Sequence, residues 1–232
     1  MKIYGLQKMT LLDFPEHVAC TVFLNGCDFR CPFCHNFELV DGSAPPVMEE
    51  PELISFLEKR RGLLDGVAFT GGEPCLHKDL PDLIAKIRSM GFLIKLDTNG
   101  YHPEMLSRLL SEGLVDYAAM DVKNSVEKYA VTAGIPSVSM DRIRESIALL
   151  KDRGGSFEYE FRTTVIREFH TEEDIRRIGE MIRGASRYFL QPFTDRDTVP
   201  YGNLHAPGRE TLDRFLMAAR EFVPAAQIRG FD

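Results

Sequence analysis

The 232-residue sequence lacks several features that would assign it to particular classes of protein. It has no excess of basic residues, since its formal net charge is -7 and its isoelectric point is about 5.5. A large nucleic-acid-binding surface is therefore not expected. No apolar run approaches the roughly 20 residues that span a bilayer. The N-terminus has no apolar run followed by a small-residue cleavage site, so no signal peptide is indicated. We expect a cytoplasmic protein with no nucleic-acid or membrane partner.

Cysteine is scarce, with five residues in the chain, and three of the five lie close together. Cys27, Cys31 and Cys34 form a C-x-x-x-C-x-x-C array on one short loop. In a cytoplasmic protein, clustered cysteines are more often metal ligands than disulfide partners. Three thiolates can hold three corners of an iron–sulfur cluster, and the fourth iron can then bind a small molecule. An electron-transfer cluster normally uses four cysteines.

A structural zinc site is the usual alternative for such an array, and it requires four ligands. Cys20 lies in the middle of an expected strand and is interpreted as a buried core thiol, while His35 directly follows Cys34. Neither is well placed as the fourth ligand. Cys75 is interpreted as an ordinary thiol. No cysteine lies between Cys34 and Gly71, so we expect a single cluster.

Strand and helix patterns alternate along the rest of the chain. Strand patterns cover residues 18–24, 66–70, 92–96, 115–120, 157–162 and 188–190, and most are followed by an amphipathic helical pattern. Residues 3–16 suggest an initial hairpin or turn, and residues 224–230 suggest one more strand. Repeated strand–helix units predict a parallel sheet with helices outside.

The length of the chain fits one α/β domain. A closed eightfold barrel needs about 250 residues, so we expect an open, partial (β/α)6 TIM-like barrel with parallel strands. The single domain would span residues 1–232. Its core would cover about residues 16–193, and residues 194–232 would form a C-terminal loop, helix and strand.

The fifth strand pattern supports an open lumen, because aromatic and charged residues alternate along it. We expect the aromatic set to face the helices and the charged set to face the lumen, where a packed core could not hold it. The aromatic residues are Phe157, Tyr159 and Phe161, and the charged residues are Glu158, Glu160 and Arg162.

Four polar motifs each follow an expected strand. The cysteine loop follows the first strand, Gly71-Gly72-Glu73-Pro74 the second, Asp97-Thr98-Asn99-Gly100 the third and Asp121-Val122-Lys123 the fourth. In a barrel the carboxyl ends of the strands gather on one rim, where active sites are built. We therefore expect these motifs to converge in space, with the cluster at the C-terminal rim.

Together the motifs resemble the radical S-adenosylmethionine (SAM) superfamily. The cysteine array with Phe33 before its last cysteine is similar to the superfamily's signature, and the later motifs follow in the order expected there. The resemblance runs from about Leu6 to Phe193. It is strongest toward activating enzymes of glycyl-radical enzymes, of the pyruvate formate-lyase type and in particular those of anaerobic ribonucleoside-triphosphate reductase. The matching stretches are Cys34-His35-Asn36, Leu96-Asp97-Thr98-Asn99-Gly100 and Met120-Asp121-Val122-Lys123.

The resemblance implies an oxidoreductase that carries a [4Fe–4S] cluster on Cys27, Cys31 and Cys34, with SAM chelating the open iron. One electron from the reduced cluster would cleave SAM to methionine and a 5′-deoxyadenosyl radical, which abstracts a hydrogen atom. The implied partners are a glycyl-radical enzyme, whose backbone glycine is the target, and a flavodoxin- or ferredoxin-like reductant.

Two other functions stay open. A radical SAM enzyme that acts on a small molecule, similar to 7-carboxy-7-deazaguanine synthase, would share the chemistry, but that family usually has a much longer first cysteine spacing. A non-catalytic iron–sulfur electron carrier or sensor is the third function, and three ligands in place of four argue against it.

The resemblance also implies roles for side chains at the rim. Glu73 would accept a hydrogen bond from the amine of SAM, and Gly71 and Gly72 would let the backbone approach a ligand closely. Phe33 would pack near the adenine, and Asn99 would contact the cofactor. The alternatives are a plain turn for the glycine motif and ordinary packing for Phe33.

Two cations at the rim, Lys123 and Arg162, would meet the carboxylate or ribose of SAM. The alternative for Arg162 is an ion pair with Glu160 or another acid in the lumen.

The resemblance further implies a monovalent cation site, because Asp97, Thr98 and Asp121 are similar to residues that bind Na⁺ or K⁺ in pyruvate formate-lyase-type activases. The Ala119 carbonyl would be a further ligand. Alternatively, Asp97 and Thr98 cap a turn.

One departure from the family concerns the last strand. Pyruvate formate-lyase-type activases carry a histidine shortly after that strand's proline, where this chain offers Gln191 and Thr194. No SAM contact can be carried over to either residue. The loop at residues 192–206 follows, and its length is typical both of functional loops and of plain surface connections.

Overall fold

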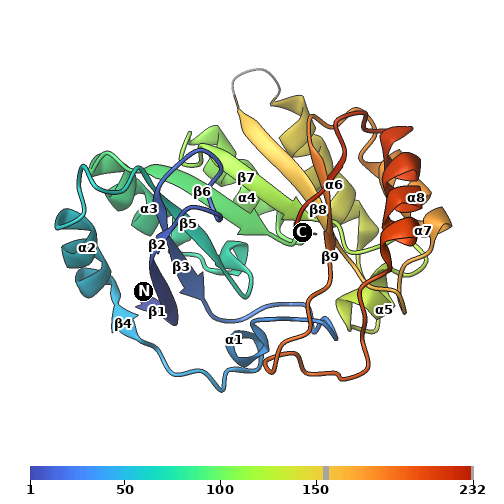
Figure 1. Cartoon of the computed structure of the whole chain (residues 1–232). Helices are drawn as coiled ribbons and strands as arrows, with labels where there is room; N and C mark the ends of the chain where they lie inside the picture. Colours follow the sequence, from blue (N-terminus) through green and yellow to red (C-terminus); the bar gives the residue numbers. More distant parts are fainter. Residues whose placement is uncertain (154–156, 231–232) are drawn as a thin grey trace.

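The computed structural model describes residues 1–153 and 157–230, and an eight-stranded sheet lies at its centre (Figure 1). The strands lie in the order β10-β9-β8-β7-β6-β5-β3-β2. Neighbours pair in parallel except β2 and β3, which are antiparallel. The strands are β2 (Gly5–Thr10), β3 (Ala19–Leu24), β5 (Gly66–Gly71), β6 (Leu93–Thr98), β7 (Tyr117–Asp121), β8 (Glu158–Val165), β9 (Tyr188–Pro192) and β10 (Gln227–Ile228).

Helices cover the outer face of the curved sheet (Figure 1). The longer ones are α2 (Glu50–Glu58), α3 (Leu80–Ser89), α4 (Pro103–Ser111), α6 (Met140–Asp152), α7 (Glu172–Met181) and α8 (Arg209–Arg220). Two short helices, α1 (Phe37–Asp41) and α5 (Tyr129–Ala133), and a 3₁₀ turn at Pro74–Leu76 lie in loops that follow strands. A separate two-stranded ladder joins β1 (Lys2–Ile3) to β4 (Met48–Glu49). Within the described parts of the chain, no helix is long and apolar enough to cross a membrane.

Local sequence explains where these elements form. β3 and β5 are almost entirely buried apolar runs, as expected for parallel strands covered by helices. Helix α7 begins at a capping box, in which the Thr171 hydroxyl accepts from the Asp174 backbone N–H and the Asp174 carboxylate accepts from the Thr171 N–H. Pro81 and Pro103 lie in the first turns of α3 and α4, where a missing N–H costs no helical hydrogen bond.

The open, partial barrel of parallel strands that the sequence predicts is confirmed. β2 and β10 are its two edges, because the initial segment forms a hairpin with β3 and the tail adds β10 beside β9. The structure adds α1 and α5 as separate helices, and it extends β8 to Val165. The single domain remains a prediction. It is supported by the central sheet, which contains strands from both ends of the chain. Residues 231 and 232 of the C-terminal segment lie outside the described residues.

Side chains of β8 alternate as predicted for two of the three charged residues. Glu160 is buried in the barrel, where it pairs with Arg229, and Arg162 faces the cavity at the rim. Glu158 is instead exposed at the start of the strand and pairs with Arg187. The lumen therefore holds charge as expected, but only where partners are available.

Candidate functional site

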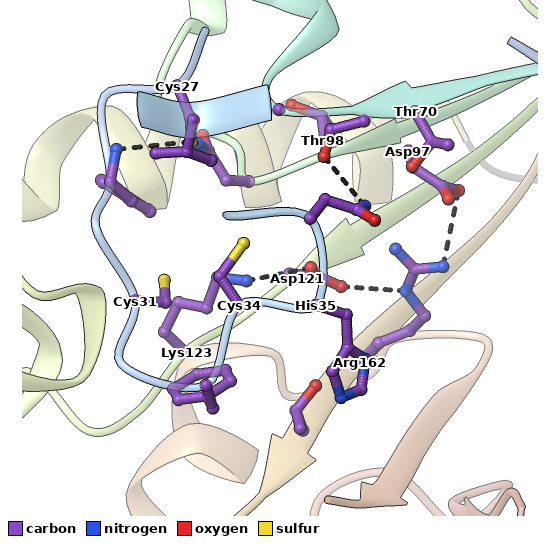
Figure 2. Close-up of a pocket in the computed structure, with 18 of the residues that line it drawn as sticks. Cys27, Cys31, Cys34, His35, Thr70, Asp97, Thr98, Asp121, Lys123 and Arg162 are labelled. Atoms are coloured by element: carbon purple, nitrogen blue, oxygen red, sulfur yellow. Dashed lines mark hydrogen bonds and ion pairs between the residues drawn. The ribbon is translucent and has the colours of Figure 1, made fainter. Parts of the chain in front are cut away.

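A cavity of about 260 Å³ opens at the carboxyl ends of the parallel strands (Figure 2). Its walls come from the cysteine loop after β3 and from the ends of β5 to β9. The four sequence motifs therefore converge at the C-terminal rim, as expected. The predicted site residues that line the cavity are Cys27, Cys31, Phe33, Cys34, Gly71, Gly72, Asp97, Thr98, Asn99, Asp121, Lys123 and Arg162. Glu73 is not part of the lining.

The three clustered cysteines are free thiols that line this cavity (Figure 2). Burial raises the pKa of Cys27 to about 12 and that of Cys31 to about 11, and it also raises the pKa of Cys34. These thiols therefore keep their protons until a metal displaces them. Two donors already reach the Cys27 sulfur, the Phe29 backbone N–H at 3.4 Å and the Asn99 side-chain amide at 3.6 Å.

This donor set fits an iron–sulfur cluster better than a single ion. Among the residues that the structure describes, no group of three or more His, Cys, Asp and Glu side chains is arranged to hold one metal ion. The ligands of a cluster bind different irons, so their sulfurs line a pocket and do not converge on a point. One buried and two partly buried thiols around one cavity, with donors to sulfur at Cys27, meet that requirement.

Contacts on both sides fix the cysteine loop. The Arg30 N–H donates to the Ala133 carbonyl at the end of α5 over 2.8 Å. Gly134 follows with a φ of +68°, and a Cβ there would lie 2.0 Å from the Arg30 carbonyl oxygen, so only glycine allows this approach. On the other side, His102 Nε2 lies 2.6 Å from the Asp28 carboxylate. The loop is thus held between α5 and the start of α4.

Gly71 and Gly72 bring the end of β5 against the chain that leads into the cysteine loop. A Cβ on Gly71 would lie 2.3 Å from the Leu24 carbonyl oxygen, and one on Gly72 would lie 2.0 Å from that of Gly26. The Gly72 N–H donates to the Leu24 carbonyl over 2.8 Å, and the Glu73 N–H to the Gly26 carbonyl over 2.7 Å. The close approach is therefore to the protein backbone, and an approach to a ligand stays a prediction.

The Glu73 carboxylate lies inside the protein, behind the cavity wall. Oε1 accepts from the Cys75 N–H at 2.9 Å and from the Thr98 hydroxyl at 2.8 Å, and Oε2 accepts from the Asn99 N–H at 2.7 Å. Burial raises the pKa of this carboxyl against the lowering effect of the three donors. Glu73 thus ties the end of β5 to the end of β6. The predicted bond to the SAM amine stays a prediction that this geometry does not favour.

Thr98 and Asn99 form the turn at the end of β6. The Thr98 hydroxyl accepts from the Gly100 N–H at 3.1 Å, and the side-chain oxygen of Asn99 accepts from the Tyr101 N–H at 2.8 Å. For Thr98 the structure therefore shows the turn-capping alternative. Asn99 combines the turn with its contact to Cys27, so it links β6 to the cysteine loop.

Arg162 lies between Asp97 and Asp121 (Figure 2). Its Nε is 2.9 Å from Asp121 and its Nη1 is 3.4 Å from Asp97. Lys123 Nζ pairs with Asp121 at 3.0 Å, and Lys95 Nζ pairs with Asp97 at 2.5 Å. Burial would raise the pKa of the Asp121 carboxyl, but Arg162 and Lys123 hold that pKa at about 2. Arg162 therefore forms ion pairs with acids of the lumen, as the alternative interpretation stated. Its partners are Asp97 and Asp121 and not Glu160.

These ion pairs bear on the predicted monovalent cation site. Asp97 and Asp121 face three cationic side chains, and the buried ammonium of Lys95 already lies against Asp97. A further cation between the carboxylates would meet three like charges, so the residues do not fit Na⁺ or K⁺ in this arrangement. The site remains a prediction without support from the geometry.

The two candidate substitutes for the family's histidine lie in different places. Gln191 lines the cavity, and Thr194 does not. The Thr194 carbonyl accepts a hydrogen bond from His35 Nε2 at 2.7 Å, and the His35 ring stacks on Phe193 with centroids 5.8 Å apart. The cysteine loop and the loop after β9 therefore meet along the same rim (Figure 1).

The cavity also includes residues that the sequence analysis missed, namely Phe29, His35, Asn36, Val40, Thr70 and Thr164. Thr164 lies two residues after Arg162 and therefore on the same face of β8. The alternation of side chains along a strand would have identified Thr164 if the predicted strand had been extended to Val165. Asn36 donates from its side chain to the Gly71 carbonyl at 3.2 Å, and no sequence signal marked that contact.

Known proteins resemble this chain over most of its length. Residues 21–182 match a family described as the Radical SAM superfamily. The chain is 30% identical to a Methanocaldococcus jannaschii protein provisionally named a glycyl-radical enzyme activating enzyme, over 98% of this chain and 95% of that protein. It is 25% identical to 7-carboxy-7-deazaguanine synthase of Thermococcus kodakarensis, over 72% of this chain and 71% of that protein. It is 28% identical to pyruvate formate-lyase-activating enzyme of Clostridium pasteurianum, over 53% and 52% respectively.

Solved structures share the fold. A radical SAM methyltransferase from Sphaerobacter thermophilus superposes with a TM-score of 0.72 at 18% identity, over 95% of this chain and 68% of that one. Streptococcus suis SuiB bound to S-adenosylmethionine superposes with a TM-score of 0.62 at 13% identity, over 90% of this chain and 52% of that one. At these identities the likeness concerns the fold alone.

Proposed function

Because this chain belongs to the radical SAM superfamily, which uses a [4Fe–4S] cluster and SAM, we propose that it activates a glycyl-radical enzyme. The observation that carries the proposal is the match over 98% of the chain to a protein provisionally named for that activity. The match to a pyruvate formate-lyase-activating enzyme supports it. The partner we propose is an enzyme like anaerobic ribonucleotide reductase, with a backbone glycine as the hydrogen donor.

Under this proposal Cys27, Cys31 and Cys34 hold the cluster. When bound there with SAM, the cluster supplies a one-electron cleavage of the sulfonium bond, which yields a 5′-deoxyadenosyl radical for hydrogen abstraction from glycine. The chain itself positions the reactants and keeps water away. A cysteine loop that is fixed on both sides provides the rigidity that this requires.

Two cationic side chains in the cavity suit the carboxylate of SAM. Lys123 and Arg162 line the cavity, where both pair with Asp121. An anionic group that enters the cavity would be attracted by these two cationic side chains. We therefore propose that Lys123 and Arg162 bind the carboxylate or ribose of SAM.

An aromatic face is available for the adenine of SAM. Phe33 is buried, lines the cavity and lies 5.9 Å from the ammonium of Lys123. A planar base can stack on such a ring at little entropic cost. The contact between Phe33 and adenine is part of the same proposal.

The first test is chemical. Protein reconstituted anaerobically with iron and sulfide, then supplied with dithionite and SAM, is expected to release 5′-deoxyadenosine. Cys27→Ala should lose both the iron and this product. Cys20→Ala is the matched control, because Cys20 is a buried thiol in β3 outside the cavity lining. Product release by Cys27→Ala at the wild-type rate would contradict the radical SAM chemistry.

The second test concerns the partner. A candidate glycyl-radical enzyme mixed with the reduced, SAM-loaded protein is expected to show the EPR doublet of a glycyl radical. Deuterium placed on the target glycine should then appear in 5′-deoxyadenosine. The control is the same partner with its glycine replaced by alanine, which should give neither signal.

A second candidate function is a radical SAM reaction on a small molecule, which the match to 7-carboxy-7-deazaguanine synthase favours. That match covers less of the chain than the match to the activating enzyme, so we rank it lower. Release of 5′-deoxyadenosine without any doublet or deuterium transfer, across the candidate partner enzymes, would favour it.

A flavodoxin- or ferredoxin-like reductant and a cytoplasmic location belong to the same proposal. Replacement of dithionite by a reduced flavodoxin should sustain product release, and failure with every such carrier would remove that part of the proposal.

A further inference from the structure

Lys95 is a charged residue of β6 that lies inside the barrel, with only 3% of its side chain exposed. A buried ammonium group is costly unless a group of opposite charge compensates it. Its Nζ lies 2.5 Å from Oδ1 of Asp97, which is two residues further along the strand and therefore on the same face. The ammonium also lies 5.9 Å from the centre of the Tyr117 ring on the neighbouring strand. Lys95 is thus a cation that the fold itself holds against the Asp97 carboxylate.

Asp97 and Asp121 are the two carboxylates of the predicted monovalent cation site, and each already has two cationic neighbours (Figure 2). Asp97 Oδ1 lies 2.5 Å from Lys95 Nζ and 3.4 Å from Arg162 Nη1. Asp121 lies 2.9 Å from Arg162 Nε and 3.0 Å from Lys123 Nζ. The positive charge that a metal ion would bring to these carboxylates is therefore supplied by side chains.

The three cations differ in their access to the cavity. Lys123 and Arg162 line it, so an incoming ligand meets both, whereas Lys95 lies behind the lining. The charge of Lys95 therefore acts on Asp97 and is not available to a ligand. Burial acts to raise the pKa of the Asp97 carboxyl, but Arg162 and Lys95 bring that pKa below its ordinary value. The carboxylate is thus kept ionised by charges of the protein.

We infer that the Lys95 ammonium takes the place of a monovalent cation beside Asp97, so this site needs neither Na⁺ nor K⁺. Both kinds of cation place one positive charge against the carboxylate, but an ammonium on the chain is present at any salt concentration. Lys95 is a positioning residue, because it acts on the cavity through Asp97 and the arginine that Asp97 contacts. The inference rests on the proposed function only for its catalytic consequence, that SAM cleavage is independent of alkali cations.

The test uses Lys95→Met, which shortens the side chain at the ammonium group and leaves room for an ion beside Asp97. The full chain is unfolded with urea in choline chloride, and again after choline is replaced by Na⁺ or K⁺ at the same ionic strength. Wild type should unfold at the same urea concentration in all three salts. In Lys95→Met, Na⁺ or K⁺ should raise the equilibrium constant for folding about tenfold when the ion is at roughly ten times its dissociation constant.

Two controls separate an ion site from a general effect of salt. Lys86→Met removes an exposed ammonium that pairs with Glu50, so it should distinguish none of the three cations. Lys95→Met combined with Asp97→Asn lacks the carboxylate that would bind the ion, so the selectivity should disappear. Selective stabilisation of wild type by Na⁺ or K⁺ would overturn the inference, and so would a folded Lys95→Met that responds equally to all three cations. If Lys95→Met folds in none of the salts, Lys95→Gln takes its place with the same expected outcomes, since its amide donates to Asp97 without a charge.

Release of 5′-deoxyadenosine gives a second measurement on the reconstituted protein. Photoreduced deazaflavin serves as the reductant, because dithionite is added as its sodium salt. Wild type should release the product at the same rate in choline and in K⁺, and Lys95→Met should require Na⁺ or K⁺. A wild type that needs either ion would overturn the inference. Absence of the product from every protein in every salt would count against the radical SAM chemistry, while the unfolding measurement would still decide the role of Lys95.

Discussion

Arg162 lies between two carboxylates that are largely screened from water. The side chains of Arg162, Asp97 and Asp121 are 14%, 17% and 30% exposed. A buried ion pair contributes little net stability, but removal of one partner weakens the compensation of the remaining charges, and here Lys95 and Lys123 still pair with the two carboxylates. At this position the chain therefore depends on the arginine for its stability as well as for the charge of the cavity.

We expect Arg162→Leu to lower the free energy of unfolding by less than the roughly 3 kcal/mol at the low end of the range for a broken buried pair, because Lys95 and Lys123 still pair with Asp97 and Asp121. Arg162→Lys should lose less, since it keeps the charge but not the fork of donors. Urea unfolding followed by circular dichroism measures both. Adding Asp121→Asn to Arg162→Leu removes the ion-pair partner of Lys123 and should increase the loss. Equal stability of wild type and Arg162→Leu would contradict this account.

At the residue scale, the sequence motifs predicted where the cavity lies but not which groups its side chains contact. The polar residues of three motifs line the cavity, because strand ends in a barrel must meet at one rim. Glu73 and the two glycines before it were assigned to a ligand, yet in the structure they contact neighbouring backbone. A sequence shows that glycine permits a close approach but not which group approaches. Lys95 was missed because a lone lysine inside a strand pattern carries no motif.

At the element scale, the pair formed by Glu160 and Arg229 fastens the edge strand β10 to the barrel. The two side chains form parallel hydrogen bonds of 2.7 and 2.8 Å, and the Tyr117 hydroxyl donates to the same carboxylate. Glu160 is fully buried, and Arg229 also lies over the ring of Phe189. Since β10 contributes only two residues to the sheet, this side-chain contact is a main attachment of the C-terminal strand.

Arg229→Met should lower the free energy of unfolding by about 3 kcal/mol, because it leaves the Glu160 carboxylate buried and unpaired. The control is Arg144→Met, which removes an exposed pair with Asp141 on α6 and should change stability by less than about 1 kcal/mol. Urea midpoints measure both variants. A loss in Arg229→Met no larger than that of the control would show that the pair does not hold β10.

The loss of stability in Arg229→Met should change with pH in a defined direction. In the wild type, burial acts to raise the pKa of Glu160, but Arg229 and Tyr117 bring it below its ordinary value. Its contribution to stability is therefore present above the unfolded pKa of about 4.3 and is lost as the pH falls through the folded value. Without Arg229, burial should raise the folded pKa above 4.3, so stability should be lost as the pH rises. The deficit of Arg229→Met should thus be larger near about pH 8 than near about pH 5.

Strand and helix periods predicted most elements but not the short ones. The repeated strand–helix pattern follows from apolar faces that the sequence shows directly. Helices α1 and α5 contain five residues each, too few for a helical period to appear, and tertiary contacts such as that between Arg30 and Ala133 stabilise them. The attachment of β10 by this ion pair also could not be predicted from the sequence, because Glu160 and Arg229 are distant in sequence.

At the scale of the whole molecule, the loop at residues 192–206 runs along the rim and is tied at both ends. Near its start, the Thr194 carbonyl accepts from His35 in the cysteine loop. Near its end, the His205 N–H donates to the Glu168 carboxylate at 2.9 Å, and the His205 carbonyl accepts from the Arg167 N–H. Of the two interpretations of this loop, a plain surface connection and a functional loop, the contact with the cysteine loop favours the second.

That contact makes the loop's order depend on His35. Loss of one hydrogen bond of about 0.5–1.5 kcal/mol should increase the open population of the loop roughly 2- to 10-fold. Arg196 is exposed within the loop and offers a site for trypsin. We therefore expect His35→Ala to be cleaved at Arg196 roughly 2- to 10-fold faster than wild type, as measured by mass spectrometry of the fragments.

The control is His17→Ala, which should leave the cleavage rate unchanged. The His17 ring contacts Phe14 just before β3, at the opposite end of the barrel. Equal acceleration in both variants would point to global destabilisation, and no acceleration in His35→Ala would show that the histidine does not hold the loop against the rim.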